Sequence, residues 1–335
     1  MEVNMKKLTT YILSLALVAV MATPSFGQGN IDKVAQTGLQ FLKVDMSARS
    51  AAMGGAYTML GNDAGTVFTN PAGLIYMDSQ FDFVATRTNW IADISYNAAA
   101  VAGNFGNVGT FALSFINSDY GEIAGTQVAA TEEGYRDTGN LDFGSTAIGL
   151  SYARALNNKF TVGGTVKWAQ QDLGRSELSS GEVVDNMTSG FAVDFGSIFY
   201  PGYIPSLRLG MNIRNFSQQF KYQEEPFDLP LTFRIGVAVD AFDFAGGSEL
   251  NSLMVSVDAL HPRDYTERVH VGTEYTYNNL LSLRAGYKTN YDQEGLSLGF
   301  GINYGIAGMD LKVDYAYSAM NIFSGVNRIS VGAAF

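Results

Sequence analysis

Histidine and cysteine limit the chemistry that this chain can perform. His261 and His270 are its two histidines, and it has no cysteine. Thiol nucleophiles, disulfides and cysteine-ligated zinc are therefore excluded, and two histidines are too few for a multi-histidine metal site. The Gly-x-Ser-x-Gly at 295–299 and the Gly-x-Gly at 299–301 both lie inside an alternating run, where neither a nucleophile elbow nor a nucleotide loop forms. The sequence predicts no enzyme, no metal and no cofactor.

Charged residues instead recur on one face of alternating apolar runs. His270 and Glu274 share a face of one run, and Arg284 and Lys288 share a face of the next. Buried charges need partners, so we interpret this face as a hydrogen-bonded charge network around a polar lumen. A catalytic site assembled from distant strands stays open as the alternative. The predicted network comprises Arg208, Arg214, Arg234, Asp258, His270, Glu274, Arg284 and Lys288.

The elements that carry these charges are predicted to be strands. In the run 281–288, Leu281, Leu283 and Tyr287 alternate with Arg284 and Lys288. Runs of about ten residues with a period of two are typical of tilted membrane strands. Such runs cover 81–90, 94–104, 107–118, 143–154, 159–170, 187–200, 204–216, 229–242, 250–261, 267–277, 280–289, 294–306, 308–319 and 326–335.

These runs predict an all-β fold, a single transmembrane antiparallel β-barrel of about 14 strands over 81–335. Charged residues make up only 16% of the chain, and the mean hydropathy is +0.04, which is too low for a bundle of membrane helices. An ordinary β-sandwich is the alternative. Long polar connections are predicted at 119–141, 171–186, 217–228 and 243–251, and long connections of bacterial barrels face the cell exterior.

The final strand ends the sequence on an aromatic residue. Ile329, Val331 and Phe335 point to one side, whereas Arg328 and Ser330 point to the other. We interpret the apolar side as facing lipid, and Ile329, Val331 and Phe335 as the signal that the barrel assembly machinery reads. Outer-membrane lipid is then the expected environment.

The first residues predict export. A positive pair, Lys6 and Lys7, precedes an apolar run over 8–20, and cleavage is expected before Gln28, which makes 1–27 a signal peptide. A membrane anchor is the alternative, but the run is shorter than the ~20 residues that a bilayer requires. The net charge of −11, without a basic run, excludes a nucleic-acid partner. We expect a location in the cell outer membrane with a periplasmic N-terminus.

Residues 28–80 differ from the rest because they show no sustained alternation, and they are predicted to form an N-terminal plug (hatch) segment. Two segments, Ser47–Tyr57 and Asn62–Leu74, resemble the PorV/PorQ family, which belongs to a wider group similar to the outer-membrane long-chain fatty acid transporter. The matching plug residues are Arg49, Met53, Gly54, Gly55, Asp63, Asn70, Pro71, Ala72 and Gly73. Asn70 to Ala72 are interpreted as an anchor of the plug rather than a ligand contact.

The resemblance implies an outer-membrane protein of the Bacteroidota type. Members named PorV take part in type IX secretion, where they work beside a large translocon barrel and receive cargo C-terminal domains. We therefore expect a non-enzymatic barrel that docks such partners. The alternative is a fatty acid transporter-like channel for hydrophobic small molecules. An open porin is disfavoured because the plug should fill the bore.

Overall fold

The computed structural model describes residues 36–335 apart from positions 142, 178–180 and 249, so the predicted signal peptide lies outside the described residues. The strands are β1 (Phe81–Asn89), β2 (Ser95–Asn104), β3 (Thr110–Asp119), β4 (Ile123–Val128), β5 (Tyr135–Leu141), β6 (Gly144–Ala155), β7 (Phe160–Glu177), β8 (Val183–Phe199), β9 (Arg208–Ser217), β10 (Phe220–Lys221), β11 (Pro226–Phe227), β12 (Thr232–Asp240), β13 (Asn251–Pro262), β14 (Arg268–Tyr277), β15 (Leu281–Lys288), β16 (Glu294–Ile306), β17 (Met309–Met320) and β18 (Val326–Ala334).

Fourteen of these strands close into an antiparallel barrel, as the sequence predicts. The order around the barrel is β1-β18-β17-β16-β15-β14-β13-β12-β9-β8-β7-β6-β3-β2. The final strand β18 pairs with both β17 and β1. Phe81 and Phe335 exchange two backbone hydrogen bonds of 2.8 and 2.9 Å at the seam. The last residues of the chain therefore close the barrel.

The outer surface of the barrel is apolar and the inner surface is polar. Leu283 is 64% exposed and Val331 is 48% exposed, whereas Arg284 and Arg328 of the same two strands are 7% and 2% exposed. An exposed apolar belt is costly in water and matches the hydrocarbon region of a bilayer. Among the described residues, no helix is long and apolar enough to cross a membrane.

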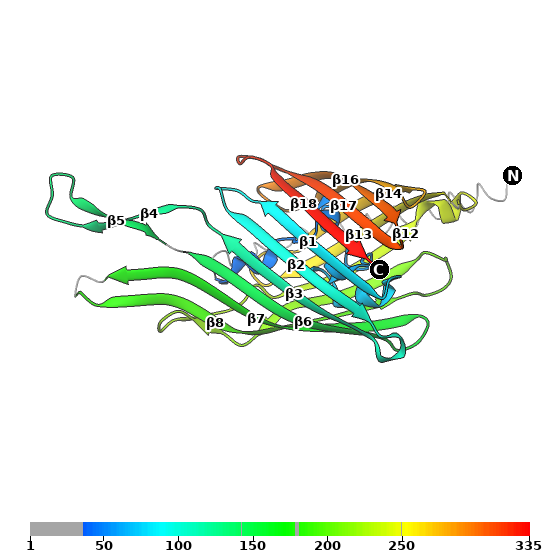
Figure 1. Ribbon diagram of the computed structural model, residues 1–335, viewed down its shortest axis with the longest axis horizontal. Coiled ribbons are helices and arrows are strands. Elements are labelled where there is room, and N and C mark those ends of the chain that lie inside the picture. Colours follow the sequence, from blue (N-terminus) through cyan, green and yellow to red (C-terminus); the bar gives the residue numbers. More distant parts are fainter. Residues whose placement is uncertain (1–35, 142, 178–180, 249) are drawn as a thin grey trace.

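The two ends of the barrel differ. At one end the turns are short, such as Ala307–Gly308 between β16 and β17. At the other end β7 and β8 continue as a long ribbon, and β4 and β5 form a separate hairpin beside it (Figure 1). We call the end with the ribbon the mouth, and by the rule for bacterial barrels it faces the exterior.

Two predicted connections need correction. The segment 171–186 is mostly strand, because β7 and β8 stay paired up to the Glu177–Val183 register. Above the membrane neither face of this ribbon contacts lipid, so the alternation that marks a lipid-facing strand disappears. The connection 243–251 lies at the end with short turns rather than at the mouth, and it follows the 3-10 helix η5 (Ala241–Phe244). A 3-10 turn, η4 (Gly106–Val108), also lies at that end.

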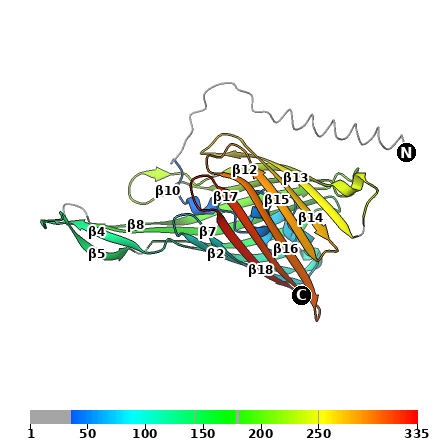
Figure 2. The same cartoon turned by 90° about the horizontal axis from the view of Figure 1, so that it is seen from above.

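Residues 36–80, which we call the plug, run inside the barrel (Figures 1 and 2). Their short helices are η1 (Gln40–Lys43), α2 (Ala48–Ala52), η2 (Ala64–Phe68) and η3 (Pro71–Tyr76). The main apolar cluster joins plug side chains such as Phe41 and Phe68 to alanines of the barrel wall such as Ala100 and Ala147. Small wall residues thus leave room for a filled lumen.

Candidate functional site

The plug crosses the lumen from the mouth to the opposite end. Near its start, the Gly38 N–H donates to the Asp228 carbonyl at 3.0 Å, in the connection between β9 and β12. Near its end, Tyr76 and Thr161 share a hydrogen bond of 3.2 Å close to the start of β7. The predicted periplasmic N-terminus lies outside the described residues, but the first described residues lie at the opposite, mouth end. The first described residues lie at the mouth because the plug crosses the whole bore before β1 begins at the other end.

The segment from Ser47 to Gly55 forms a tight bend against the wall. The Ser47 hydroxyl accepts a hydrogen bond from the Ser50 N–H at 3.3 Å and caps α2. Gly54 and Gly55 follow with φ of 63° and 76°, a conformation that favours glycine. At Gly54 a Cβ would also lie 2.8 Å from the backbone nitrogen of Tyr287 in β15. The Met-Gly-Gly part of the motif therefore fits the plug to the wall, and Met53 itself is fully buried.

Asp258 of β13 holds the next part of the plug. Its carboxylate accepts hydrogen bonds from the backbone N–H of Tyr57 at 3.2 Å and of Thr58 at 3.1 Å, and from the Thr58 hydroxyl at 2.5 Å. Ser256 on the same strand donates to the Ala56 carbonyl at 2.5 Å. The predicted network residue Asp258 is thus an anchor for the plug backbone.

Asn70 fixes the lower part of the plug. Its side chain donates to the Thr58 carbonyl at 2.7 Å and accepts from the Ala72 N–H at 3.1 Å. Pro71 and Ala72 pack against Gly163 of β7, where a Cβ would lie 2.5 Å from the backbone. Of the other two motif residues, Gly73 lies buried in η3 and Asp63 caps η2. These contacts agree with the interpretation as an anchor.

A chain of alternating charges crosses the lumen below the bend. Arg49 binds both carboxylate oxygens of Glu274, at 2.6 and 2.7 Å. Arg284 bonds Glu274 at 2.5 Å and Asp314 at 2.6 Å. The sequence predicts Glu274 and Arg284 as members of one lumenal charge network, but it does not connect the motif residue Arg49 to that network. This chain of charges joins the plug to β14, β15 and β17.

The other predicted network residues form no ion pair with Arg49, Glu274, Arg284 or Asp314. Arg208 lies on the far side of the plug from the mouth, with its guanidinium 5.5 Å from the Tyr200 ring centre. Arg214, Arg234, His270 and Lys288 lie on the mouth side and line a separate cavity. The predicted single network is therefore two groups, because the plug divides the lumen between them.

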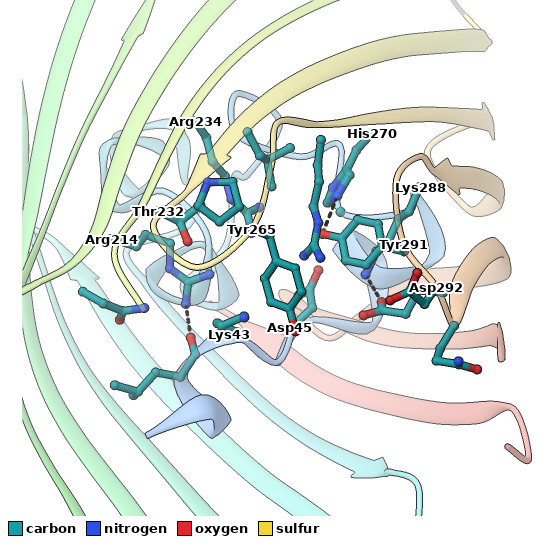
Figure 3. Close-up of a pocket in the computed structure, with 18 residues that line it drawn as sticks. Lys43, Asp45, Arg214, Thr232, Arg234, Tyr265, His270, Lys288, Tyr291 and Asp292 are labelled. Carbon is teal, nitrogen blue, oxygen red and sulfur yellow. Dashed lines mark hydrogen bonds and ion pairs between the residues drawn. The ribbon is translucent and has the colours of Figure 1, made fainter. Parts of the chain in front are cut away.

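Two cavities correspond to these groups. The lower cavity, of about 810 Å³, is lined by Arg49, Asp63, Arg208, Glu274 and Arg284, among others. The upper cavity, of about 250 Å³, we call the mouth pocket (Figure 3). Its lining residues are Leu42, Lys43, Asp45, Gly55, Arg214, Asn215, Thr232, Arg234, Leu260, Pro262, Tyr265, Arg268, His270, Lys288, Tyr291, Asp292, Gln293 and Glu294.

Aromatic rings order the centre of the mouth pocket. The guanidinium of Arg268 lies 4.0 Å from the Tyr265 ring centre and 3.8 Å from that of Tyr291, so it is stacked between two rings. His270 shares a hydrogen bond of 2.9 Å between Nε2 and the Tyr291 hydroxyl, visible in Figure 3. Its Nδ1 is buried without a hydrogen-bond partner among the described residues.

Ion pairs stabilise the rim of the pocket. Lys43 of the plug binds Asp264 at 2.8 Å in the connection between β13 and β14, and Lys288 binds Glu294. Burial raises the pKa of Asp264, but the hydrogen bonds from Lys43 and Thr37 outweigh it and leave this pKa below its ordinary value. The pair therefore holds the start of the plug at the mouth.

Sequence reasoning missed Lys43, Tyr265, Arg268 and Tyr291. For Arg268 a signal was present, since the period of two that selects His270 and Glu274 also selects position 268. Tyr265 and Tyr291 lie in connections, where no period applies. Among the residues that the structure describes, no group of three or more histidine, aspartate or glutamate side chains could hold a metal ion.

A closed barrel of fourteen strands with an apolar belt and a plug in its lumen is an outer-membrane β-barrel by its fold. The toluene transporter TodX of Pseudomonas putida matches with a TM-score of 0.57 at 13% identity, over 86% of this chain and 96% of that chain. The CymD monoaromatic hydrocarbon channel matches with 0.55 at 14%, over 87% and 98%. A Pseudomonas aeruginosa FadL homologue matches with 0.52 at 11%, over 87% and 98%. The chain shares the fold of these barrels.

No protein-family model matches the chain, and the comparison with curated proteins found no match either. The resemblance to PorV and PorQ is therefore not shown by these comparisons, and the predicted roles of the plug and network residues stay predictions.

Proposed function

We propose that this protein is an outer-membrane channel that admits small molecules from the exterior, with the plug as its gate. The observation that carries the proposal is the pair of cavities on opposite sides of the plug, one below the mouth and one toward the other end. A molecule entering at the mouth meets a cavity, then the bend of the plug, then a second cavity. Such an order suits capture followed by release.

The structural neighbours support a transport role. Two of them are described as a monoaromatic hydrocarbon channel and a toluene transporter, and they share the barrel fold across most of both chains. Small hydrophobic compounds are thus the first substrates to test. A channel for small hydrophobic molecules therefore has more support than docking in type IX secretion, because no comparison supports the PorV/PorQ assignment.

Passage through the bore requires the plug to move. Between the two cavities, the segment from Ser47 to Thr58 packs on the wall from β13 to β18, and it is held by the Asp258 and Glu274 contacts described above. The barrel strands themselves form a closed ring in which each strand pairs with two neighbours. We therefore assign the gating motion to the plug.

Permeation across reconstituted membranes tests the proposal. Purified protein in proteoliposomes should release trapped small solutes faster than protein-free liposomes do. A variant without residues 37–60 should form an open pore and serves as the control for insertion. If that variant conducts while the intact protein matches protein-free liposomes for every solute, the channel proposal is wrong.

Docking remains a second candidate, because the mouth carries an unusual projection. The ribbon of β7 and β8 and the hairpin of β4 and β5 extend beyond the barrel (Figure 1) and expose Val128, Val183 and Met187. Such a surface suits a protein partner, for which a type IX translocon barrel or cargo C-terminal domains are the candidates that the PorV/PorQ resemblance implies. Crosslinked purification from native outer membranes, followed by mass spectrometry, would identify these partners. Recovery of the protein without these partners would contradict the docking role and leave the channel function as the remaining proposal.

Two further proposals concern biogenesis. Residues 1–27 would direct export, and the barrel assembly machinery would read Ile329, Val331 and Phe335. The exposed positions of these three side chains, at 48%, 48% and 58%, support the second proposal. Both proposals are independent of the channel function.

A further inference from the structure

Three arginines of the mouth pocket have no carboxylate partner within the part of the chain that the structure describes. Arg214 donates one hydrogen bond, from Nη2 to the Leu42 carbonyl at 3.3 Å. The side chains of Arg234 and Arg268 form no hydrogen bond and no ion pair there, and the Nε of all three is buried without an acceptor. The guanidinium groups therefore retain most of their capacity to donate.

These charges are largely removed from solvent. Arg214 and Arg268 are each only 8% exposed. A buried charge without a counter-ion is unfavourable. Stacking between Tyr265 and Tyr291 holds Arg268 in place, so this side chain is not free to turn toward water. Figure 3 shows Arg214 and Arg234 on the same side of the pocket, facing the space around Tyr265.

The carboxylates that also line the pocket form no ion pair with these arginines among the described residues. Glu294 is paired with Lys288, as described above. Asp45 accepts hydrogen bonds from the Ser47 N–H at 3.1 Å and from the Ser50 hydroxyl at 2.5 Å, which orient it toward its own segment of the plug. Asp292 is the third. Outside the lining, Asp194 and Asp258 attract Arg214 and Arg234, but Asp194 is paired with Lys167 and Asp258 binds the plug backbone. The three guanidinium groups therefore keep donors from which no carboxylate of the described residues accepts.

We propose that the mouth pocket binds a small solute through an oxyanion, a carboxylate or a phosphate, which the guanidinium groups of Arg214, Arg234 and Arg268 hold by charge-assisted hydrogen bonds. The volume of about 250 Å³ is below the ~300–1000 Å³ of pockets for drug-sized ligands, so the solute is small. The binding of this solute is inferred independently of the channel function. The inference that the channel also transports this solute rests on the proposed channel function.

Titration calorimetry on the full-length protein in detergent tests the inference. The probes are inorganic phosphate, benzoate and benzamide, the last having nearly the shape of benzoate without its charge. We expect saturable binding of phosphate, of benzoate or of both, which tells the two oxyanions apart, and no binding of benzamide. Equal binding of benzoate and benzamide, or no saturable binding of either anion, would overturn the proposal.

Substitutions locate the site. Arg268→Met and Arg234→Met should each weaken anion binding by about tenfold or more, because each removes charged donors. Arg234 is half-buried and makes no side-chain hydrogen bond or ion pair among the described residues, so Arg234→Met should fold even if Arg268→Met does not. Arg175→Met removes the same charge from the ribbon, where Arg175 is 77% exposed by its side chain, and should leave binding unchanged.

An equal loss in all three variants would mean nonspecific attraction and would overturn the proposal. Failure of the channel has a different signature. In that case proteoliposomes remain impermeable while anion binding and its dependence on Arg234 persist.

Discussion

Gly54 of the plug lies directly against Gly286 of β15, so closely that a Cβ on Gly286 would overlap the Gly54 nitrogen. Gly54 also has a φ of 63°. The contact is between two backbones, which cannot move aside as a flexible side chain can. The fit of the plug to the wall thus depends on the absence of two side chains.

Gly286→Ala should destabilise the folded barrel. Inserting atoms into a closely packed site typically costs about 1–3 kcal/mol, and we expect the upper part of that range because the neighbours are backbone atoms. Urea unfolding in lipid or detergent measures the free energy of unfolding. Gly144→Ala is the matched control, since a Cβ there has no neighbour within 4 Å and should have little effect. Equal stability of the two variants would contradict the close contact.

Arg49→Met should cost about 3 kcal/mol, because it removes one partner of a buried ion pair and leaves the Glu274 carboxylate with Arg284 alone. Arg175→Met removes a solvent-exposed pair with Asp185 and should cost less than about 1 kcal/mol. A double-mutant cycle of Arg49→Met with Glu274→Gln should show coupling between the two sites. Additive effects would mean that the pair contributes no interaction energy.

The pair of Lys43 and Asp264 predicts a dependence on pH. The pKa of Asp264 lies below its ordinary value of 3.8, so the contribution of this group to stability is present above about pH 4 and is lost as the pH falls through the depressed pKa. The melting temperature of Asp264→Asn should therefore lie below that of the wild type at pH 6. The difference should shrink in strong acid.

Asp185→Asn is the control for that experiment, because Asp185 is 69% exposed by its side chain and its pair on the ribbon contributes little. A difference for Asp264→Asn that does not change with pH would indicate a cause other than the carboxylate charge.

Deletion of residues 327–335 should abolish assembly, since β18 supplies the pairing to both β1 and β17. The folded barrel should migrate differently on gels before and after heating, and the truncated chain should lose this difference. Phe335→Ala is the milder variant. It removes the ring that lies 5.9 Å from the Phe81 ring but retains the strand, and some assembly should remain. Normal insertion of the truncated chain would contradict the closing role of β18.

The barrel could be predicted from the sequence because lipid imposes a strict alternation. Residues such as Leu283 and Arg284 must face opposite environments, and that requirement leaves a period of two in every membrane strand. Where lipid ends, the constraint ends, so the extension of β7 to Glu177 and the small hairpins within the connections left no signal.

The mouth pocket could be predicted only in part. Arg214, Arg234, His270 and Lys288 carry the period of the wall and were predicted to face the lumen. Their separation from Glu274 could not be predicted, because it depends on the path of the plug. The contact of Lys43 with Asp264 joins positions 221 residues apart and has no local signature.

A reversible lock on the plug tests the central claim most directly. The chain has no cysteine, so Thr58→Cys with Asp258→Cys introduces its only thiols, at side chains that now share a hydrogen bond of 2.5 Å. Solute release from proteoliposomes would be measured with this variant reduced, oxidised and reduced again, and with the wild type under the same oxidant. We predict release that stops on oxidation and returns on reduction, with the wild type unaffected. Release that continues through the locked protein, or none from the reduced one, would contradict a channel gated by its plug.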